Sequence, residues 1–296
     1  MSATIDTSTR IGLVGLGIMG APMALRLRDR GFALTAWNLE PERYDVVRDA
    51  GVTWADSAAD VWKASDVVIV CVLGDDALES VCFGETGFAT SGGGARLLID
   101  TSTTSPAATA RLAPKLKEQL GADWIDAPMS GGPGAARDGT LTLMIGGDET
   151  ACAASAPLLE AIAGNVTRMG DRGAGQVTKI LNQAIVGVNY ILMAELLTIA
   201  RNADIDPDLL GKCLQGGMAD STILQRIFPQ MAHSDFDPPR STAKQVNKDL
   251  KSVIAFLEEL GLSLPVIDTS VARYREWAED GNLAQDGAAV SRLYGH

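Results

Sequence analysis

The sequence predicts an α/β fold in which a doubly wound parallel sheet is followed by a smaller all-helical domain. Its first half alternates short apolar runs with helical patterns, and the runs are apolar on both faces, as expected for parallel strands covered by helices on both sides. After about residue 175 no strand signal interrupts the helical pattern. A chain of 296 residues is also long enough for two domains. We therefore expect a first domain over residues 1–172 and a helical domain over residues 173–296.

Six strands are expected in the first domain. They are RIGLVGLG (10–17), FALTAW (32–37), VVIVCVL (67–73), RLLIDTS (96–102), DWIDAP (123–128) and LTLMIGG (141–147). Between the first two, APMALRLRDRG (21–31) predicts a helix that stops at Gly31, because glycine favours helix termination. Helical stretches or loops separate most of the later strands.

The second domain should begin with one long connecting helix from about residue 175. The segment QVTKILNQAIVGVNYILMAELLTIARNAD (176–204) has no strand punctuation and is much longer than a typical globular helix. Further on, DLKSVIAFLEELG (249–261) repeats apolar residues at spacings of three and four, which predicts a helix with one buried stripe.

Composition excludes several kinds of partner. The formal net charge is −12 and Lys and Arg do not cluster, which argues against nucleic acid. No apolar window is expected to reach membrane-spanning length, and the first ten residues do not resemble a secretion signal. The four cysteines are scattered without metal-type spacing, so we expect no metal site and reduced thiols in a cytoplasmic protein.

A G-x-G-x-x-G motif follows the first predicted strand. Its residues are Gly15, Leu16, Gly17, Ile18, Met19 and Gly20. In a strand–turn–helix context the first glycine allows the tight turn, the second lets the backbone approach a pyrophosphate, and the third lets the helix pack on the strand. The helix N-terminus adds free amides that favour phosphate. The context therefore predicts a Rossmann-type dinucleotide site rather than an ordinary turn.

The tip of the second strand, in LTAWNLEPER (34–43), bears on the choice between NAD and NADP. An acidic residue there would bind the adenosine ribose and repel a 2′-phosphate, but this chain has Asn38. Arg43 is close enough in sequence to reach a phosphate, although a solvated charge on a helix surface is the favoured interpretation of this residue. Leu39 and Glu40 do not favour the phosphate. We expect activity with NAD and NADP, with a slight preference for NADP.

Two further segments predict a substrate site. In DAPMSGG (126–132), Ser130, Gly131 and Gly132 follow a strand and can present a hydroxyl and amides to a small carboxylate, although such a stretch is also an ordinary turn signal. In GDRGAGQVTKILNQ (170–183), Lys179 and Asn182 lie three residues apart and share one helix face. The chain has only two histidines, so any acid–base chemistry must look beyond histidine.

Together these segments resemble the β-hydroxyacid dehydrogenases, the family that includes 3-hydroxyisobutyrate dehydrogenase and 2-hydroxy-3-oxopropionate (tartronate semialdehyde) reductase. GLGIMGAPMA, DAPMSGG, GDRGAGQVTKILNQ and the KDL of residues 248–250 occur in the family's order and span nearly the whole chain. The resemblance implies that Lys179 is catalytic, that Asn182 orients the substrate and that Ser130–Gly132 bind its carboxylate. Gly173 and Gly175 would let the helix approach nicotinamide and substrate.

The resemblance also implies further cofactor contacts. Thr103 of DTSTTSP would lie beside the nicotinamide and substrate, and Lys248 would contact the cofactor. Leu73 and Gly74 occupy the place of a Leu-Pro pair that lines the cofactor in the family, and Gly74 departs from that proline. Lys179 disfavours the related imine reductases, and the helical domain is too small for a 6-phosphogluconate dehydrogenase.

Substrate choice within the family stays open at this stage. GGMADSTIL (216–224) is similar to the 2-hydroxy-3-oxopropionate reductase branch, so Met218, Ser221 and Thr222 could border the substrate, or Ser221 or Thr222 could simply cap a helix. The alternatives are 3-hydroxyisobutyrate dehydrogenase, another small hydroxy-acid dehydrogenase, and a non-catalytic dinucleotide sensor. The apolar long helix predicts a homodimer or homotetramer.

Overall fold

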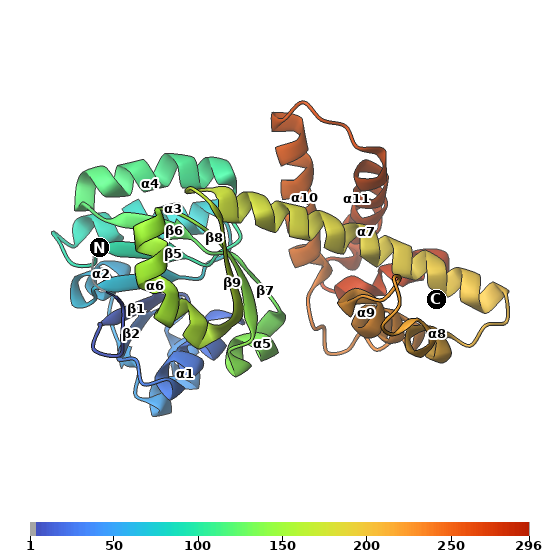
Figure 1. Ribbon diagram of the computed structural model, residues 1–296, viewed down its shortest axis with the longest axis horizontal. Coiled ribbons are helices and arrows are strands. Elements are labelled where there is room, and N and C mark those ends of the chain that lie inside the picture. The colour runs from blue at the N-terminus through green and yellow to red at the C-terminus, as the bar shows by residue number, and fades with distance from the viewer. Residues whose placement is uncertain (1–3, 296) are drawn as a thin grey trace. The chain divides into compact units, whose positions relative to one another are not determined.

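The computed structural model describes residues 4–295, which form two compact units that divide between Lys179 and Ile180. The first unit is built on a nine-stranded sheet (Figure 1). Its strands are β1 (Ile11–Val14), β2 (Leu34–Trp37), β3 (Thr53–Trp54), β4 (Val67–Val70), β5 (Leu97–Asp100), β6 (Asp123–Asp126), β7 (Met129–Ser130), β8 (Leu141–Gly146) and β9 (Ala163–Gly170).

Strand order confirms the predicted fold class. The strands β3-β2-β1-β4-β5-β6 are all parallel, in the order of a Rossmann fold. The prediction of a wholly parallel sheet is wrong at the far edge, because β8 runs antiparallel to β6 and β7 and pairs in parallel with β9. Strands β3, β7 and β9 are not predicted from the sequence. β3 and β7 are only two residues long, and most residues of β9 are exposed.

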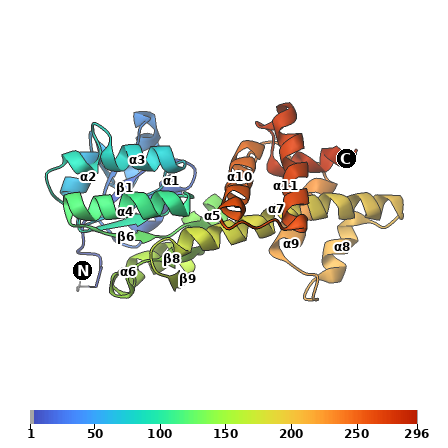
Figure 2. The same cartoon turned by 90° about the horizontal axis from the view of Figure 1, so that it is seen from above.

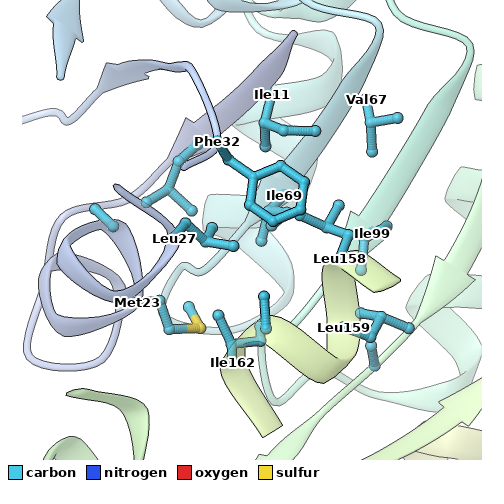
Figure 3. Packing of buried hydrophobic residues seen from close by; sticks show 14 of the residues in the cluster. Ile11, Met23, Leu27, Phe32, Val67, Ile69, Ile99, Leu158, Leu159 and Ile162 are labelled. Atoms are coloured by element: carbon cyan, nitrogen blue, oxygen red, sulfur yellow. The ribbon is translucent and has the colours of Figure 1, made fainter. Parts of the chain in front are cut away.

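Helices cover both faces of this sheet. On one face lie α1 (Gly20–Asp29), α5 (Gly132–Asp138) and α6 (Glu149–Ile162), and on the other lie α2 (Ala58–Ala64), α3 (Asp75–Phe83) and α4 (Pro106–Leu120). Alternate residues of β4 enter the two cores, as the strand period of two requires. Figure 3 shows Met23 and Leu27 of α1 and Leu158 and Ile162 of α6 around Ile69. The short 3-10 helices η1 (Pro41–Val46), η2 (Arg48–Ala50) and η3 (Phe88–Thr90) complete the unit.

The second unit is helical, as predicted. The long helix α7 (Ala174–Asn202) leads into α8 (Pro207–Leu214), α9 (Thr222–Ala232), α10 (Ala243–Glu259), α11 (Pro265–Trp277) and the short η4 (Ala278–Asn282) and η5 (Gly287–Tyr294). Helices α10 and α11 lie side by side (Figure 1 and Figure 2). Tyr274 is fully buried and makes edge-to-face contacts with Tyr190 and Trp277, so aromatic rings fill the centre of this unit.

Helix α7 corrects one expectation drawn from composition. Its 29 residues are long and apolar enough to span a membrane by length and composition alone, so the prediction that no apolar window reaches that length is wrong. The core helix of a soluble protein passes the same test, and 44% of the most apolar window of α7 is buried inside the protein. The apolar character of α7 therefore arises partly from core packing and partly from apolar side chains that remain exposed.

Candidate active site

The three glycines of the first motif have different surroundings. Gly15 has a φ of 101°, and a Cβ there would lie 2.1 Å from the carbonyl oxygen of Cys71. A Cβ on Gly20 would lie 1.9 Å from the carbonyl oxygen of Gly15. Gly17 is exposed, and a Cβ there would meet no atom within 4 Å. The fold itself therefore requires Gly15 and Gly20, while the space at Gly17 is available to a ligand such as a pyrophosphate.

The motif's loop lies at the carboxyl edge of the sheet, where strand order reverses between β1 and β4. Ligands of open α/β sheets bind at such a switch point. The remaining motif residues differ in exposure: Leu16 is buried, Met19 is half-buried and Ile18 is exposed. The first turn of α1, all of which the structure describes, carries no acidic side chain that would compete with a phosphate. The residues present therefore fit a dinucleotide.

Asn38 lies directly after β2 and is buried. Its Oδ1 accepts a hydrogen bond from the backbone amide of Leu16 at 2.7 Å, and its Nδ2 donates to the carbonyl oxygen and to Oε2 of Glu40 at 3.1 and 2.8 Å. Arg43 is exposed on η1. Asn38 thus joins the glycine loop to the turn after β2. This structural role cannot be predicted from its position in the sequence.

The loop after β4 differs from a Leu-Pro pair in its backbone. Gly74 has a φ of 89°, which proline cannot adopt because its ring fixes φ near −65°. Leu73 is exposed, and the amide of Val72 donates to Ser102 Oγ at 3.0 Å. A proline at position 74 would therefore not fit this backbone conformation.

The start of α7 is fastened to β6 by Asp126. Its two carboxylate oxygens accept hydrogen bonds from the backbone amides of Gly173 at 2.7 Å and Gln176 at 2.9 Å. A Cβ on Gly175 would lie 2.3 Å from the carbonyl oxygen of Met144, so this glycine lets α7 pack on β8. The expectation that Gly175 leaves room for cofactor and substrate is wrong, because the protein's own backbone fills that space. Gly173, by contrast, borders open space.

Gln176 connects the same turn of α7 to the segment after β5. It is fully buried, its Nε2 donates to the carbonyl oxygen of Ser102 at 2.9 Å, and its Oε1 accepts from the amide of Thr104 at 3.2 Å. The half-buried Thr103 lies between these two residues. Gln176 therefore fixes the backbone on both sides of Thr103.

Lys179 follows one turn later and is only 7% exposed. Its Nζ donates to the carbonyl oxygen of Met129 at 2.8 Å, and Met129 pairs with β8 next to Ser130 in the short strand β7. Two segments that are 50 residues apart in sequence are thus brought together. The buried ammonium is held beside the loop that the sequence predicts for a carboxylate.

That loop has two glycines in conformations that other residues rarely adopt. Gly131 has a φ of 135° and Gly132 a φ of 79°. A Cβ on Gly131 would lie 2.7 Å from the Cβ of Ala135, whereas Gly132 borders open space. Ser130 is half-buried. The loop therefore has a defined shape with an open side, which a small anion can use.

In the second unit a chain of polar contacts links Asn182 to the KDL segment. Asn182 Nδ2 donates to Gln183 Oε1 at 2.6 Å, and Gln183 Nε2 donates to Asp249 Oδ2 at 2.5 Å. Lys248 Nζ lies 3.3 Å from Asp249 Oδ1. Asp249 thus connects two segments that the sequence predicts for the site.

Ser221 Oγ accepts from the amide of Leu224 at 3.0 Å and caps α9, which supports the capping interpretation of that residue. Thr222 is the first residue of α9, and Met218 is fully exposed. Among residues 4–295 no group of three His, Cys, Asp or Glu side chains is arranged to hold a metal ion. A cavity of about 310 Å³ between α10 and α11 is lined by none of the candidate residues.

Two buried carboxyl groups, those of Asp100 and Asp126, accept hydrogen bonds from segments of the candidate site. Burial raises the pKa of Asp100 to about 7, against hydrogen bonds from Ser102 and Thr104 that lower it. Burial also raises the pKa of Asp126, and the backbone amides of Gly173 and Gln176 oppose that shift. The fold therefore favours the neutral form of Asp100.

Asp100→Asn is expected to flatten the pH dependence of stability. Burial raises the folded-state pKa of Asp100 from its ordinary value near 4 to about 7, so the contribution of this group to stability is complete below about pH 4 and is lost as pH rises through about 7. That loss amounts to at most about 4 kcal/mol of the free energy of unfolding. Denaturant unfolding at pH 5 and pH 8 measures the free energy of unfolding of both proteins. Relative to the wild type, the variant should be more stable at pH 8 than it is at pH 5. An equal difference in the free energy of unfolding between variant and wild type at both pH values would contradict the raised pKa of Asp100.

Asp126, Gln176 and Glu40 are the residues that sequence reasoning missed. Asp126 and Gln176 both stand inside the quoted motifs, so their polar side chains among apolar neighbours were the available signal. In the sequence Glu40 indicates only a negative charge near the end of the second strand. Its contact with Asn38 depends on the turn after β2 and has no sequence signal of its own.

Comparisons with known proteins show the family to which the chain belongs. Residues 10–170 match the model of the NAD-binding domain of 6-phosphogluconate dehydrogenase, and residues 173–294 match the NAD-binding domain of NADP-dependent 3-hydroxyisobutyrate dehydrogenase. The chain is 35% identical to 2-hydroxy-3-oxopropionate reductase of Escherichia coli strain K12 over 281 residues, which cover 95% of each chain.

Two further relatives cover nearly the whole chain. A 3-hydroxyisobutyrate dehydrogenase of Pseudomonas aeruginosa is 32% identical over 97% of this chain and 98% of its own. The crystal structure of a 3-hydroxyisobutyrate dehydrogenase from Salmonella typhimurium superposes with a TM-score of 0.85 at 28% identity, covering 96% of this chain and 99% of that one. With its Rossmann strand order and its glycine loop, the chain therefore belongs to the 3-hydroxyisobutyrate dehydrogenase-like family of NAD(P)-binding oxidoreductases.

Proposed function

We propose that the protein transfers a hydride between NAD(P) and a small 3-hydroxy acid or aldehydo acid, with 2-hydroxy-3-oxopropionate as the first candidate substrate. The observation that carries the proposal is the contact of Lys179 with Met129, which holds a buried ammonium beside the Ser130 loop. The similarity to the Escherichia coli 2-hydroxy-3-oxopropionate reductase supports this substrate, and 3-hydroxyisobutyrate is the alternative.

The bound nicotinamide would supply the hydride for reduction of the carbonyl carbon. As negative charge grows on the carbonyl oxygen, the Lys179 ammonium stabilises it and donates a proton to it. In the oxidative direction the neutral amine takes the proton of the hydroxyl group. Because Gln176 and Asp126 fix the same end of α7, Lys179 is positioned before substrate binds. Asn182, one turn further along α7, would orient the substrate.

Ser130→Ala should raise KM for carboxylate substrates with little effect on kcat. Ser130 would donate a charge-assisted hydrogen bond to the carboxylate in ground state and transition state alike, so its loss is worth about 1.5–3 kcal/mol, or roughly 10–100-fold in KM. Steady-state kinetics with saturating cofactor measure this. An unchanged KM would place the anion site elsewhere.

A substrate panel tests the proposed reaction. The purified full chain is assayed by nicotinamide absorbance with 2-hydroxy-3-oxopropionate, 3-hydroxyisobutyrate and L-threonate, each with both cofactors. The proposal expects the highest kcat/KM for 2-hydroxy-3-oxopropionate. Preference for 3-hydroxyisobutyrate would select the alternative substrate, and cofactor binding without turnover of any compound would favour the dinucleotide sensor.

We also propose that the protein is a cytoplasmic homodimer or homotetramer that associates through α7. Leu181, Ile185, Leu192 and Ile199 are exposed, and at 100° per residue they fall within about 40° of one another on the helix. Such a continuous apolar stripe is typical of an interaction surface.

Leu192→Glu should therefore reduce the molecular mass in solution to that of one chain. Light scattering after size exclusion measures the mass. Met218→Glu is the matched control, because Met218 is an exposed apolar residue outside the stripe. An unchanged mass for Leu192→Glu would remove α7 as the contact surface.

A further inference from the structure

The turn after β2 holds an acidic side chain in a defined position. Asn38 uses Oδ1 to accept from the Leu16 amide and Nδ2 to donate to Glu40, at its carbonyl oxygen and at Oε2. Both polar ends of the Asn38 amide therefore have partners within the protein. Glu40 itself is exposed, so its carboxylate is tethered by Asn38 and still accessible from solvent.

This position is where dinucleotide-binding folds recognise the adenosine ribose. In the strand–glycine loop–helix arrangement, a residue at the end of the second strand lies beside the ribose, and an acidic one accepts hydrogen bonds from its hydroxyls. Here the Leu16 amide connects the end of β2 directly to the glycine loop. The carboxylate at this place belongs to Glu40, which is two residues beyond Asn38 and three residues beyond the end of β2.

We infer that Glu40, held by Asn38, recognises the adenosine ribose and selects NAD(H) over NADP(H). The inference rests on the proposed use of NAD(P) by this site. A carboxylate accepts hydrogen bonds from the 2′- and 3′-hydroxyls, whereas it repels a 2′-phosphate at the same place. This preference is opposite to the slight preference for NADP that Asn38 and Arg43 suggest when only the sequence is considered.

The charges around this turn do not favour a phosphate. From residue 40 to residue 48 three other charged side chains accompany Glu40 and Arg43, namely Glu42, Asp45 and Arg48. Arg48 is engaged in an ion pair with Asp45 and lies over the Tyr44 ring. Arg43 is thus the remaining guanidinium of the turn, and Glu40 and Glu42 stand on either side of it in sequence. The turn therefore lacks the positive excess that a 2′-phosphate requires.

The test compares two single substitutions on the same turn. Glu40→Gln removes the charge but keeps an oxygen that can accept from Asn38, and Glu42→Gln is the control for loss of one exposed charge. Dissociation constants for NADH and NADPH are measured on the full chain by calorimetry, without substrate, at low and high salt. The wild type should bind NADH more tightly. Glu40→Gln should shift the ratio of the two constants toward NADPH by about tenfold or more, and Glu42→Gln by much less.

The salt series adds a second readout. Salt ions screen the repulsion between the Glu40 carboxylate and the 2′-phosphate. High salt should therefore reduce the preference for NADH over NADPH in the wild type more than in Glu40→Gln. An unchanged ratio in Glu40→Gln, or equal shifts in both variants, would overturn the role of Glu40. These measurements need no turnover, so failure of the proposed substrate leaves them valid. Absence of binding by either dinucleotide would count against Glu40 and against the cofactor site together.

Discussion

Lys179→Ala is expected to lower kcat by about 10²–10⁴-fold while the dissociation constant for the cofactor changes little. The side chain is buried, and its Nζ is held 2.8 Å from the Met129 carbonyl oxygen, beside the Ser130 loop. Its removal withdraws a positive charge and a proton donor that act mainly in the transition state, so kcat should fall more than affinity. Single-turnover rates and cofactor titration separate the two quantities.

Three further variants test this result. Lys63→Ala removes an exposed lysine at the end of α2 and should leave kcat unchanged. Asn182→Ala should have a milder effect than Lys179→Ala, because an amide that orients the substrate transfers no proton. Lys179→Met keeps the buried stem without the charge, so a loss of activity there with normal thermal stability separates chemistry from packing. Wild-type turnover in Lys179→Ala would refute the assignment.

Substitutions at Gly17 and Gly20 should have opposite consequences although both lie in one motif. Gly17→Ala adds a Cβ to open space at a backbone conformation that alanine accepts, so the fold should keep its stability. The same methyl group would obstruct the approach of a pyrophosphate to the backbone, and we expect the cofactor dissociation constant to rise about 10–100-fold.

Gly20→Ala places its methyl group 1.9 Å from the Gly15 carbonyl oxygen, so α1 must move. Overpacking of this kind costs about 1–3 kcal/mol or more, and the free energy of unfolding should fall accordingly. Denaturant unfolding and cofactor titration on both variants measure the contrast. A loss of stability in Gly17→Ala, with normal binding, would mean that the space at Gly17 serves the fold rather than a ligand.

Much of the fold could be predicted because its signals are local. Buried parallel strands read as apolar runs, and the helix after β1 and the long α7 have clear patterns in the sequence. Strand β9 could not be predicted in this way, since it lies at the sheet edge and most of its side chains are exposed. Its pairing with β8 depends on tertiary contacts that no local pattern records.

Most residues of the candidate site could be predicted from the sequence, but the contacts between them could not. The motifs give Lys179 and Ser130 as candidates, yet the contact through Met129 joins segments that are distant in sequence. The role of Gly175 was misjudged because the sequence cannot show whether free space beside a glycine is used by a ligand or by Met144 of the protein itself. Likewise, Asn38 looks like a ribose ligand until its two hydrogen-bonding partners are known.

The anchoring of the first turn of α7 matters for the construction of chimeric enzymes. Asp126 and Gln176 fasten that turn to the sheet, and Lys179 falls in the first compact unit although it belongs to the long helix. A crossover at the start of α7 would take Lys179 from one parent and strand β7, whose Met129 carbonyl oxygen accepts its hydrogen bond, from the other. Recombination with a relative should therefore be made after Lys179, so that the lysine and its anchors are inherited from one parent and the substituted helices bring only their own residues.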